Sequence, residues 1–383
     1  MQSRAGKTEN TTADWSAWAS VPWSPVGVGD SPNNNNTNTP IGWLKSGIPY
    51  LPQEDAVALQ TLDVWIPANT SSSSSTTTTT TTTPNQSSPP PNPPNKTWIV
   101  YIHGGAWRDP AITSTSFTAA ATNLLLRAAG TTNADSTLSL SESGLAGLVS
   151  LNYRLSPHPS HPPSTPADKL SRSARHPEHV ADVRAALAFL GRLGILGGGG
   201  SGGGNWVLAG HSCGATLAFQ AVMHPRRWGL ASRGEVASPG EGLPKPAVLV
   251  GFNGLYDLAG FIAAPPEGFG HLREGYREFV EGAFGADEGV WKNVCPATVE
   301  GNWVGEWIGD GHADGEGPGK TVVLVQSRED TLVPWDQLEA MRARLADEGR
   351  VGVKVMEATG KHDDVWREGG RMAEVLWNTL RGM

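Results

Sequence analysis

The sequence has few of the features that mark membrane, disulfide-rich or nucleic-acid-binding proteins. Only two of its 383 residues are cysteines, Cys213 and Cys295, and neither has the spacing of a metal or redox site. Basic runs are absent and the formal net charge is −8, which argues against nucleic acid or an anionic membrane as a partner. The first thirty residues contain no apolar segment after a basic start, and no later apolar run is long enough to span a bilayer. We therefore expect a soluble, cytoplasmic protein.

Glycine and proline, in contrast, are abundant and unevenly distributed. The chain has 47 Gly and 29 Pro, concentrated with Ser, Thr and Asn in four stretches: 71–94, 197–204, 238–246 and 309–319. Such stretches bury too little apolar surface to offset the entropy lost on ordering, so we expect them to be surface loops. We predict a disordered tail at 1–40, anchored around Trp15–Trp23, and one domain at 41–383 with a flexible insert at about 69–95.

Apolar segments of two kinds alternate between these loops. Short β-rich runs predict strands at 59–66, 98–102, 145–155, 206–209, 246–252, 321–326 and 351–356. Helical spacing of apolar residues predicts helices at 177–191, 215–222, 334–345 and 371–380. Strands that alternate with helices predict an α/β fold with a mainly parallel sheet and helices on both faces. Ligands of such sheets bind at the carboxyl ends of the strands.

The motif Gly210-His211-Ser212-Cys213-Gly214 lies between a predicted strand and a predicted helix. In this context G-x-S-x-G is typical of a nucleophile elbow, in which a strained turn lifts the serine hydroxyl above the sheet. Glycines flank the serine because larger side chains would clash, and the start of the helix favours developing negative charge. We predict Ser212 to be a nucleophile.

A second glycine-rich loop, which begins with His103, Gly104 and Gly105, follows the strand predicted at 98–102. Glycine allows backbone N–H groups to approach a ligand closely. In serine hydrolases such a loop, together with the residue after the nucleophile, forms an oxyanion hole. We predict that the N–H groups of Gly104, Gly105 and Cys213 have this role.

A serine nucleophile needs a base, and the base needs a carboxylate that orients it. After Ser212 the chain has four histidines: His224, His271, His312 and His362. We place His224 inside the helix after the elbow and His312 in a Gly/Asp-rich loop. Only His362 follows a late strand and precedes the last helix, so we predict it to be the base.

The carboxylate should lie between the serine and the histidine in the chain. Asp330 follows the strand predicted at 321–326 and is our choice, with Glu329 beside it. Asp257 is the rival, although its position fits the cap of a helix or turn.

Other polar clusters indicate less. Four histidines lie among prolines without the spacing of a zinc site: His158, His161, His176 and His179. The acidic segment 310–316 does not match a calcium loop, and we interpret it as a solvated linker.

Five segments together resemble the fungal kynurenine formamidase (arylformamidase) family of the α/β-hydrolase superfamily. They are HGGAWRDP at 103–110, NYRLSP at 152–157, HPEHVADV at 176–183, GHSCGATLAFQ at 210–220 and GKHDDVW at 360–366. The resemblance extends from about residue 47 to the C-terminus and fails in the low-complexity inserts.

The resemblance implies an α/β-hydrolase fold and hydrolysis of N-formyl-L-kynurenine to L-kynurenine and formate, a step of tryptophan breakdown on the kynurenine pathway toward NAD. It implies the triad Ser212, Asp330 and His362. It also implies a cytosolic, often dimeric enzyme without a metal or organic cofactor. A wall for the aryl ring is one role for Trp107, and core packing is the other.

Two other functions remain open at this point. One is a general carboxylesterase of the hormone-sensitive-lipase type, which shares the loop that begins with His103, Gly104 and Gly105, called the HGG loop below. The other is a binding protein on a catalytically silent α/β-hydrolase fold, although such proteins usually lack the serine or the histidine.

Overall fold

The structure is a computed structural model. It describes residues 16–27, 40–52, 56–68, 70–72, 79–90, 95–130, 144–197, 205–230, 243–309 and 319–383. Statements about contacts below concern these residues.

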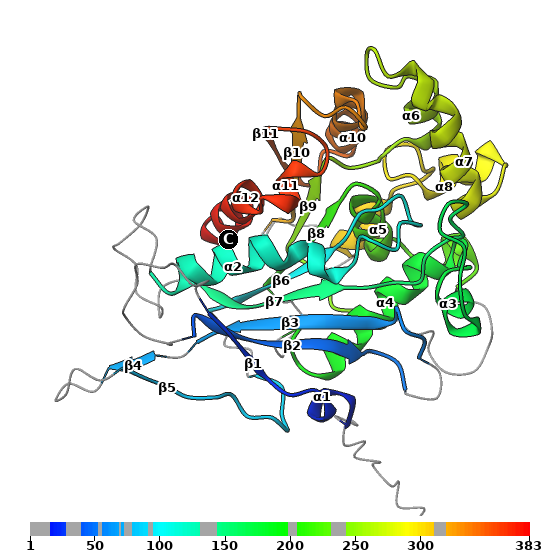
Figure 1. Cartoon of the computed structure of the whole chain (residues 1–383). Coiled ribbons are helices and arrows are strands. Elements are labelled where there is room, and N and C mark those ends of the chain that lie inside the picture. The colour runs from blue at the N-terminus through cyan, green and yellow to red at the C-terminus, as the bar shows by residue number, and fades with distance from the viewer. Residues whose placement is uncertain are drawn as a thin grey trace, which may run out of the picture.

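A nine-stranded sheet forms the centre of the molecule (Figure 1). In spatial order its strands are β1 (Ser24–Val26), β2 (Gly42–Pro49), β3 (Thr61–Pro67), β7 (Leu145–Leu151), β6 (Thr97–Ile102), β8 (Trp206–His211), β9 (Val248–Phe252), β10 (Thr321–Ser327) and β11 (Gly352–Ala358). The first three strands pair antiparallel, and β3 is antiparallel to β7. All pairs from β7 to β11 are parallel, so their carboxyl ends lie along one edge of the sheet. A separate two-stranded ribbon consists of β4 (Thr70–Ser72) and β5 (Thr79–Thr81).

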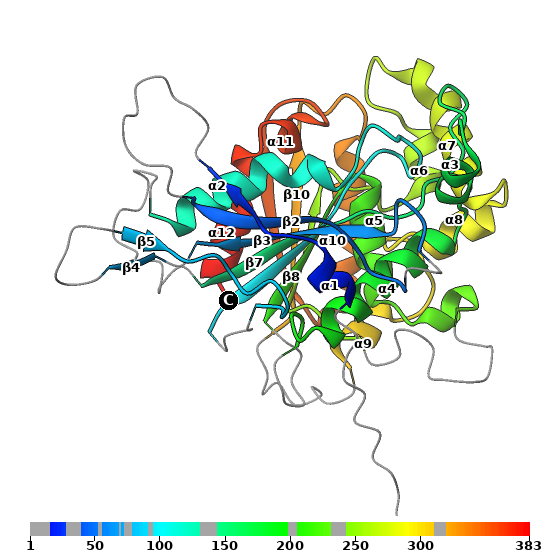
Figure 2. The ribbon, with the colours of Figure 1, turned by 60° about the horizontal axis from the view of Figure 1, so that its bottom comes forward.

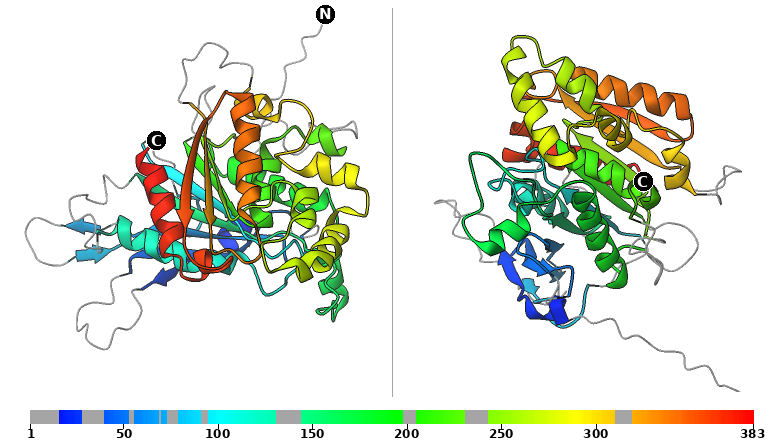
Figure 3. Two further views of the ribbon diagram at one scale, coloured as in Figure 1. Left: turned by 90° about the horizontal axis from the view of Figure 1, so that it is seen from above. Right: turned by 90° about the vertical axis from the view of Figure 1, so that its right-hand side faces the viewer.

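Helices cover both faces of this sheet, as the alternation of elements predicts. Side chains of α2 (Thr118–Ala128) and α12 (Gly370–Arg381) pack in one hydrophobic core cluster. Side chains of α4 (Glu178–Arg192), α5 (Cys213–Val222) and α10 (Trp335–Glu348) pack in the other. Alternate residues of β6 enter the two clusters, Val100 one and Tyr101 the other, because successive strand residues point to opposite faces. Figure 3 shows α10 and α12 on opposite sides of β10 and β11.

Between β9 and β10 the described residues form four further α-helices: α6 (Leu258–Ala263), α7 (Arg273–Phe284), α8 (Glu288–Val294) and α9 (Trp303–Ile308). Figures 1 and 2 show α6, α7 and α8 gathered at one end of the molecule, with α3 (Pro166–Ser171) near them. Helix α7 is amphipathic and buries Tyr276 and Phe279 on its inner face. The helical segment between β9 and β10 therefore contributes buried aromatic side chains from outside the sheet.

Parts of the predicted N-terminal tail and of the predicted insert form secondary structure and long-range contacts. Residues 16–27 form α1 (Ser16–Ser20) and β1, and Trp18 and Trp23 are buried. The buried ammonium of Lys45 donates to the Trp18 carbonyl at 2.8 Å and lies 4.9 Å from the centre of its ring. Gln86, inside the predicted insert, donates from Nε2 to the Val21 carbonyl at 2.7 Å. Long-range contacts thus hold segments whose composition favours disorder, while 1–15, 28–39, 73–78 and 91–94 lie outside the described residues.

Most predicted elements are confirmed within two residues at their ends. The strand predicted at 145–155 is shorter and ends at Leu151. The next residue, Asn152, makes side-chain hydrogen bonds outside the strand. Its Oδ1 accepts from the Ser114 N–H at 2.7 Å, and its Nδ2 donates to Thr61 Oγ1 at 3.1 Å. Among the helices in the described ranges, none has the length and apolarity needed to cross a membrane.

Candidate active site

Ser212 lies in a strained turn between β8 and α5. Its φ and ψ are 54° and −125°, a conformation that costs a non-glycine residue about 1–3 kcal/mol. A Cβ on Gly210 would lie 2.2 Å from the Gly214 oxygen, and one on Gly214 would lie 2.2 Å from the Ile102 oxygen. The prediction that both flanking positions require glycine is therefore confirmed, and the turn holds the serine at the carboxyl edge of the sheet.

The HGG loop passes directly beside this serine. A Cβ on Gly104 would lie 3.1 Å from Cβ of Ser212, and Gly105 has a φ of 95° that favours glycine. The N–H groups of Gly104 and Gly105 donate to no other backbone group in the described part of the chain. Cys213 is the first residue of α5, where an N–H has no acceptor within the helix. The role of these three N–H groups as oxyanion donors stays a prediction, with Gly104 beside Ser212 and Gly105 lining the same cavity as Ser212.

Two side chains connect the HGG loop to the elbow. The Cys213 Sγ accepts from the Trp107 N–H at 3.3 Å and lies 3.6 Å from the Tyr153 hydroxyl. Tyr153 Oη also donates to the His103 carbonyl at 3.1 Å. Burial raises the pKa of the Cys213 thiol to about 11, so it is neutral near pH 7. Cys213 therefore acts in the structure as a small packing residue, and Tyr153 is a contact that sequence reasoning missed.

Asp330 and His362, which are 32 residues apart in the chain, meet in the structure. His362 Nδ1 lies 2.7 Å from Asp330 Oδ2, and the Asp330 side chain is fully buried. Because a carboxylate only accepts hydrogen bonds, Nδ1 carries the proton of this bond. In the neutral imidazole, Nε2 then has a free lone pair. The other carboxylate oxygen accepts from the N–H groups of Leu332 and Val333, each at 2.8 Å. The pair therefore has the tautomer that a general base requires.

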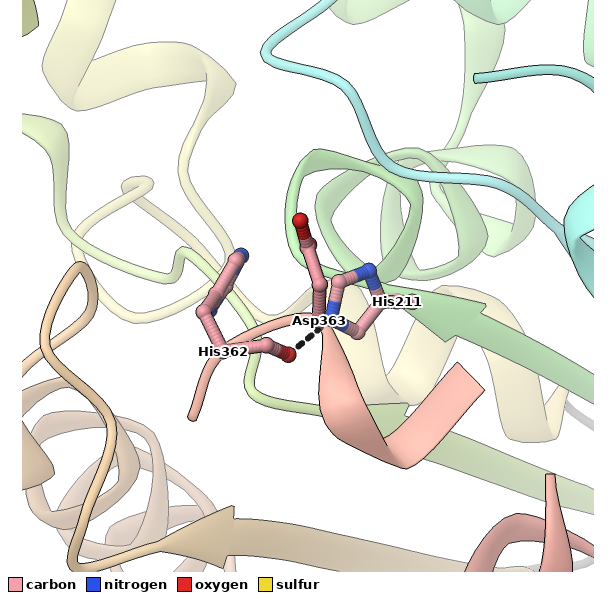
Figure 4. A group of neighbouring side chains, drawn as sticks. All are labelled: His211, His362 and Asp363. Carbon is pink, nitrogen blue, oxygen red and sulfur yellow. Dashed lines mark hydrogen bonds between the residues drawn. The ribbon is translucent and has the colours of Figure 1, made fainter. Parts of the chain in front are cut away.

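The loop that carries His362 is held by its backbone carbonyl. His211 Nε2 lies 2.9 Å from that oxygen, and Asn253 Nδ2 donates to it at 3.0 Å. Figure 4 shows the bond from the His211 ring to the His362 oxygen, with the Asp363 side chain beside the two rings. Burial lowers the pKa of His211 to about 3, with the proximity of His362 adding to the effect, so His211 is a neutral donor at physiological pH. His211 and Asn253 are positioning residues that no sequence pattern indicated.

Ser212 and His362 line one cavity of about 250 Å³ without a direct hydrogen bond between them in the described structure. Bonds of this kind are often long in the absence of substrate and shorten in the complex. The cavity is bounded by the HGG loop, the loops after β9, β10 and β11, and helices α6 and α7, with these further lining residues: Gly105, Ala106, Arg108, Asp109, Ile112, His158, Leu255, Phe261, Tyr276, Phe279, Leu332, Val333 and Asp363. Its volume suits a small ligand.

Trp107 is not among the lining residues. Its side chain is fully buried, with the ring centre 4.9 Å from that of Phe284 and 6.2 Å from that of Phe279. Of the two roles considered for Trp107, the structure shows core packing. The aromatic wall of the cavity instead comes from Phe261, Tyr276 and Phe279, in the segment between β9 and β10.

The rival residues lie elsewhere. Asp257 caps α6, with Oδ1 accepting from the Gly260 N–H at 3.0 Å. The prediction that His224 lies inside the helix is wrong, because α5 ends at Val222. His224 instead caps the 3-10 turn Pro225–Trp228 through a bond of 3.2 Å from the Arg226 N–H. His271 lies in the 3-10 turn Gly270–Leu272, just before α7, and is exposed. His312 and the acidic segment 310–316 lie outside the described residues.

The histidine cluster noted in the sequence does not assemble. His158 and His161 contact each other at 3.2 Å, whereas His179 is buried against Ser156 and the half-buried His176 packs against Trp228. In the described ranges, one group of three side chains has ligand atoms within 4.8 Å of one another: His211, His362 and Asp363. The two rings already bond through Nε2 of His211 and Nδ1 of His362, so only the other nitrogen of each ring could bind a metal.

Comparisons with known proteins agree with this architecture. A kynurenine formamidase-like hydrolase of Fusarium equiseti is 33% identical over 348 residues, which cover 88% of this chain and 94% of that protein. A kynurenine formamidase of Aspergillus versicolor is 30% identical over 278 residues, covering 71% of this chain and 84% of that protein. No family model matches the sequence.

Solved structures show the same fold at low sequence identity. An esterase B from Lactobacillus rhamnosis has a TM-score of 0.52 at 14% identity, over 91% of this chain and 89% of that chain. A carbohydrate esterase from gut microbiota has a TM-score of 0.50 at 16% identity, over 89% and 96% of the two chains. Together with the strand order, these likenesses show an α/β-hydrolase fold. The protein is a hydrolase, and it belongs to the kynurenine formamidase family.

Proposed function

We propose that this protein is an arylformamidase that hydrolyses N-formyl-L-kynurenine to L-kynurenine and formate, with Ser212, His362 and Asp330 as its catalytic triad. The observation that carries the proposal is the Asp330–His362 pair, bonded at 2.7 Å, at the cavity that Ser212 also lines. The relatives named as a kynurenine formamidase and a kynurenine formamidase-like hydrolase support the choice of substrate. On this proposal the protein acts in tryptophan breakdown.

The reaction begins with attack of Ser212 Oγ on the formyl carbon while His362 Nε2 takes the hydroxyl proton. The resulting oxyanion accepts from the N–H groups of Gly104, Gly105 and Cys213, each of which contributes in the range of about 2.7–4 kcal/mol to the transition state in comparable enzymes. Protonated His362 then gives its proton to the leaving arylamine nitrogen, and the C–N bond breaks. Water then attacks the formyl-serine while His362 takes its proton. The bond from the formyl carbon to Ser212 Oγ breaks as His362 returns that proton to Oγ, which releases formate.

Asp330 has an electrostatic role in both halves of this cycle. It keeps the His362 proton on Nδ1 and stabilises the imidazolium that forms twice per turnover. The bonds from His211 and Asn253 to the His362 carbonyl hold the loop so that the ring faces the cavity. The lining of Phe261, Tyr276 and Phe279 offers apolar contact to an aryl group.

A general carboxylesterase is the second candidate, because the structural neighbours are esterases and share the fold. The small cavity and its aromatic wall favour an aryl formamide over a long-chain ester. A silent binding protein is disfavoured, because the bonded Asp330–His362 pair has no evident use without a nucleophile.

The test is kynurenine release from N-formyl-L-kynurenine by the purified protein, followed by absorbance, with Ser212→Ala as the control. We expect rapid release by the wild type and a loss of at least about 10³-fold in kcat for S212A. Cleavage of p-nitrophenyl acetate without kynurenine release would support the carboxylesterase instead. Formylkynurenine turnover by S212A at the wild-type rate would overturn the nucleophile assignment.

A further inference from the structure

Arg108 differs from every other residue that lines the cavity. It is the only lysine or arginine among these described lining residues, and its side chain is only 14% exposed. The Arg108 N–H donates to the Gly105 carbonyl at 2.9 Å, so a short turn links this cation to the predicted oxyanion hole. A guanidinium is therefore held at the wall of the same small chamber in which Ser212 lies.

The contacts of Arg108 leave part of its guanidinium available. NH1 lies 3.4 Å from Glu278 Oε1, a long contact to a carboxylate that is 52% exposed. A long ion pair with an exposed partner contributes little. The guanidinium carbon lies 5.7 Å from the centre of the Phe279 ring, which restricts the side chain from one side. Since a guanidinium has five N–H donors, several remain for a ligand.

Other ionisable groups around the cavity do not duplicate this charge. His158 also lines the cavity, and burial together with the positive charge of Arg108 lowers its pKa, so it is neutral at physiological pH. Asp109 and Asp363 are anionic when charged and cannot attract an anion. Asp109 Oδ1 accepts from the Ala111 N–H at 2.9 Å, and Asp363 Oδ2 contacts Arg367 at 3.2 Å. Arg108 is thus the one lining group suited to bind a carboxylate.

We propose that Arg108 binds the carboxylate of an aryl-formamide substrate and so makes the enzyme selective for amino-acid substrates. This inference rests on the proposed function. The substrate aryl ring lies against Phe261, Tyr276 and Phe279, the formyl carbon lies at Ser212, and the acid group reaches the guanidinium. A planar guanidinium can bind a carboxylate through two parallel hydrogen bonds, which gives both affinity and orientation.

A pair of substrates that differ only in the carboxylate tests this directly. They are N-formyl-L-kynurenine and its decarboxylated analogue N-formylkynuramine, which keeps the aryl formamide and the amine. The wild type should prefer the acid. Arg108→Gln should lower kcat/KM for formylkynurenine about 10- to 100-fold more than for formylkynuramine, mainly through KM, because charge-assisted hydrogen bonds contribute about 1.5–3 kcal/mol. Arg108→Lys should recover part of the preference, because it keeps the charge but not the planar fork.

Glu278→Gln is the matched control, because it breaks the same ion pair from the side that does not line the cavity. We expect E278Q to retain the preference for the acid. An equal loss on both substrates in R108Q, or the same loss in E278Q, would show that Arg108 is only structural and would overturn this inference. Failure of the wild type on both formamides, with p-nitrophenyl acetate still cleaved, would instead refute the proposed function.

Discussion

Both carboxylate oxygens of the buried Asp330 side chain accept hydrogen bonds. One oxygen accepts two backbone N–H groups, and the other contacts His362 Nδ1 at 2.7 Å and Gln326 Nε2 at 3.4 Å. Every acceptor direction of the side chain thus faces a donor, and solvent does not reach it. The His362 ring is oriented by a group that cannot easily rotate away, which is what a base of fixed tautomer needs.

We expect Asp330→Asn to lower kcat by about 10⁴-fold, because the amide stabilises the wrong tautomer of His362 and cannot stabilise its cation. Steady-state kinetics on formylkynurenine measures this. Asp257→Asn is the matched control. Asp257 caps α6, and asparagine caps helices about as well as aspartate, so both activity and stability should be retained. If D257N were the inactive variant, Asp257 would be the orienting acid.

Among the elements, the HGG loop and α5 depend on each other. Tyr153 Oη donates to the His103 carbonyl and contacts Cys213 Sγ, which in turn accepts from the Trp107 N–H. These contacts connect the loop after β6, the loop after β7 and the first turn of α5. The predicted oxyanion donors Gly104 and Gly105 lie in the loop after β6, and Cys213 lies in α5. The distance between these two elements therefore depends on the contacts of Tyr153 and Cys213.

Tyr153→Phe should therefore reduce kcat by about 2- to 10-fold with little change in KM, the range expected for one lost neutral hydrogen bond. Kinetics together with the melting temperature measures it. Tyr50→Phe is the control, because Tyr50 Oη donates to the Asn152 carbonyl at 3.2 Å and does not contact the HGG loop. Equal kinetic effects in the two variants would show that Tyr153 has no special link to the site.

For the molecule as a whole, four histidines with a lowered pKa contribute to how stability depends on pH. Burial lowers the pKa of His103 and His176 to about 4, and that of His179 and His211 to about 3, from an ordinary value of 6.5. In this range the unfolded chain binds more protons than the folded protein. The free energy of unfolding therefore falls as pH drops below 6.5. Above that value these histidines are neutral in both states and do not lower the free energy of unfolding.

We expect the free energy of unfolding from urea titrations to be constant above about pH 7 and to fall steadily between pH 6.5 and 4, by up to about 1.4 kcal/mol per pH unit for each histidine that stays neutral. The urea midpoint should fall with it. His179→Gln should make this decline shallower, since it removes one such group. His271→Gln, at an exposed position, should leave the slope unchanged. A midpoint that is equal at pH 7.5 and pH 5 would refute this account.

The sequence by itself determined the order and local setting of the site. A serine between close-packed glycines after an apolar strand, two glycines after an earlier strand, and an acid and a histidine after late strands are local patterns. Parallel strands bring their carboxyl ends to one edge, so residues far apart in the chain are predicted to meet there. The fold and the meeting of Asp330 with His362 followed from this rule. The same local reasoning identified Asp257 as a cap, because a cap acts within three residues.

Only the tertiary structure decided what surrounds the reacting groups. Asn253 and His362 are 109 residues apart, and no spacing rule connects them. Phe261, Tyr276 and Phe279 come from helices outside the sheet, whose path local patterns do not specify. Trp107 belongs to the same motif as the predicted oxyanion donors Gly104 and Gly105 yet packs in the core, while its neighbour Arg108 lines the cavity. The N-terminal segment is ordered through Trp18, Lys45 and Gln86. Contacts of this kind depend on how side chains from distant parts of the chain pack together, so local sequence patterns do not specify them.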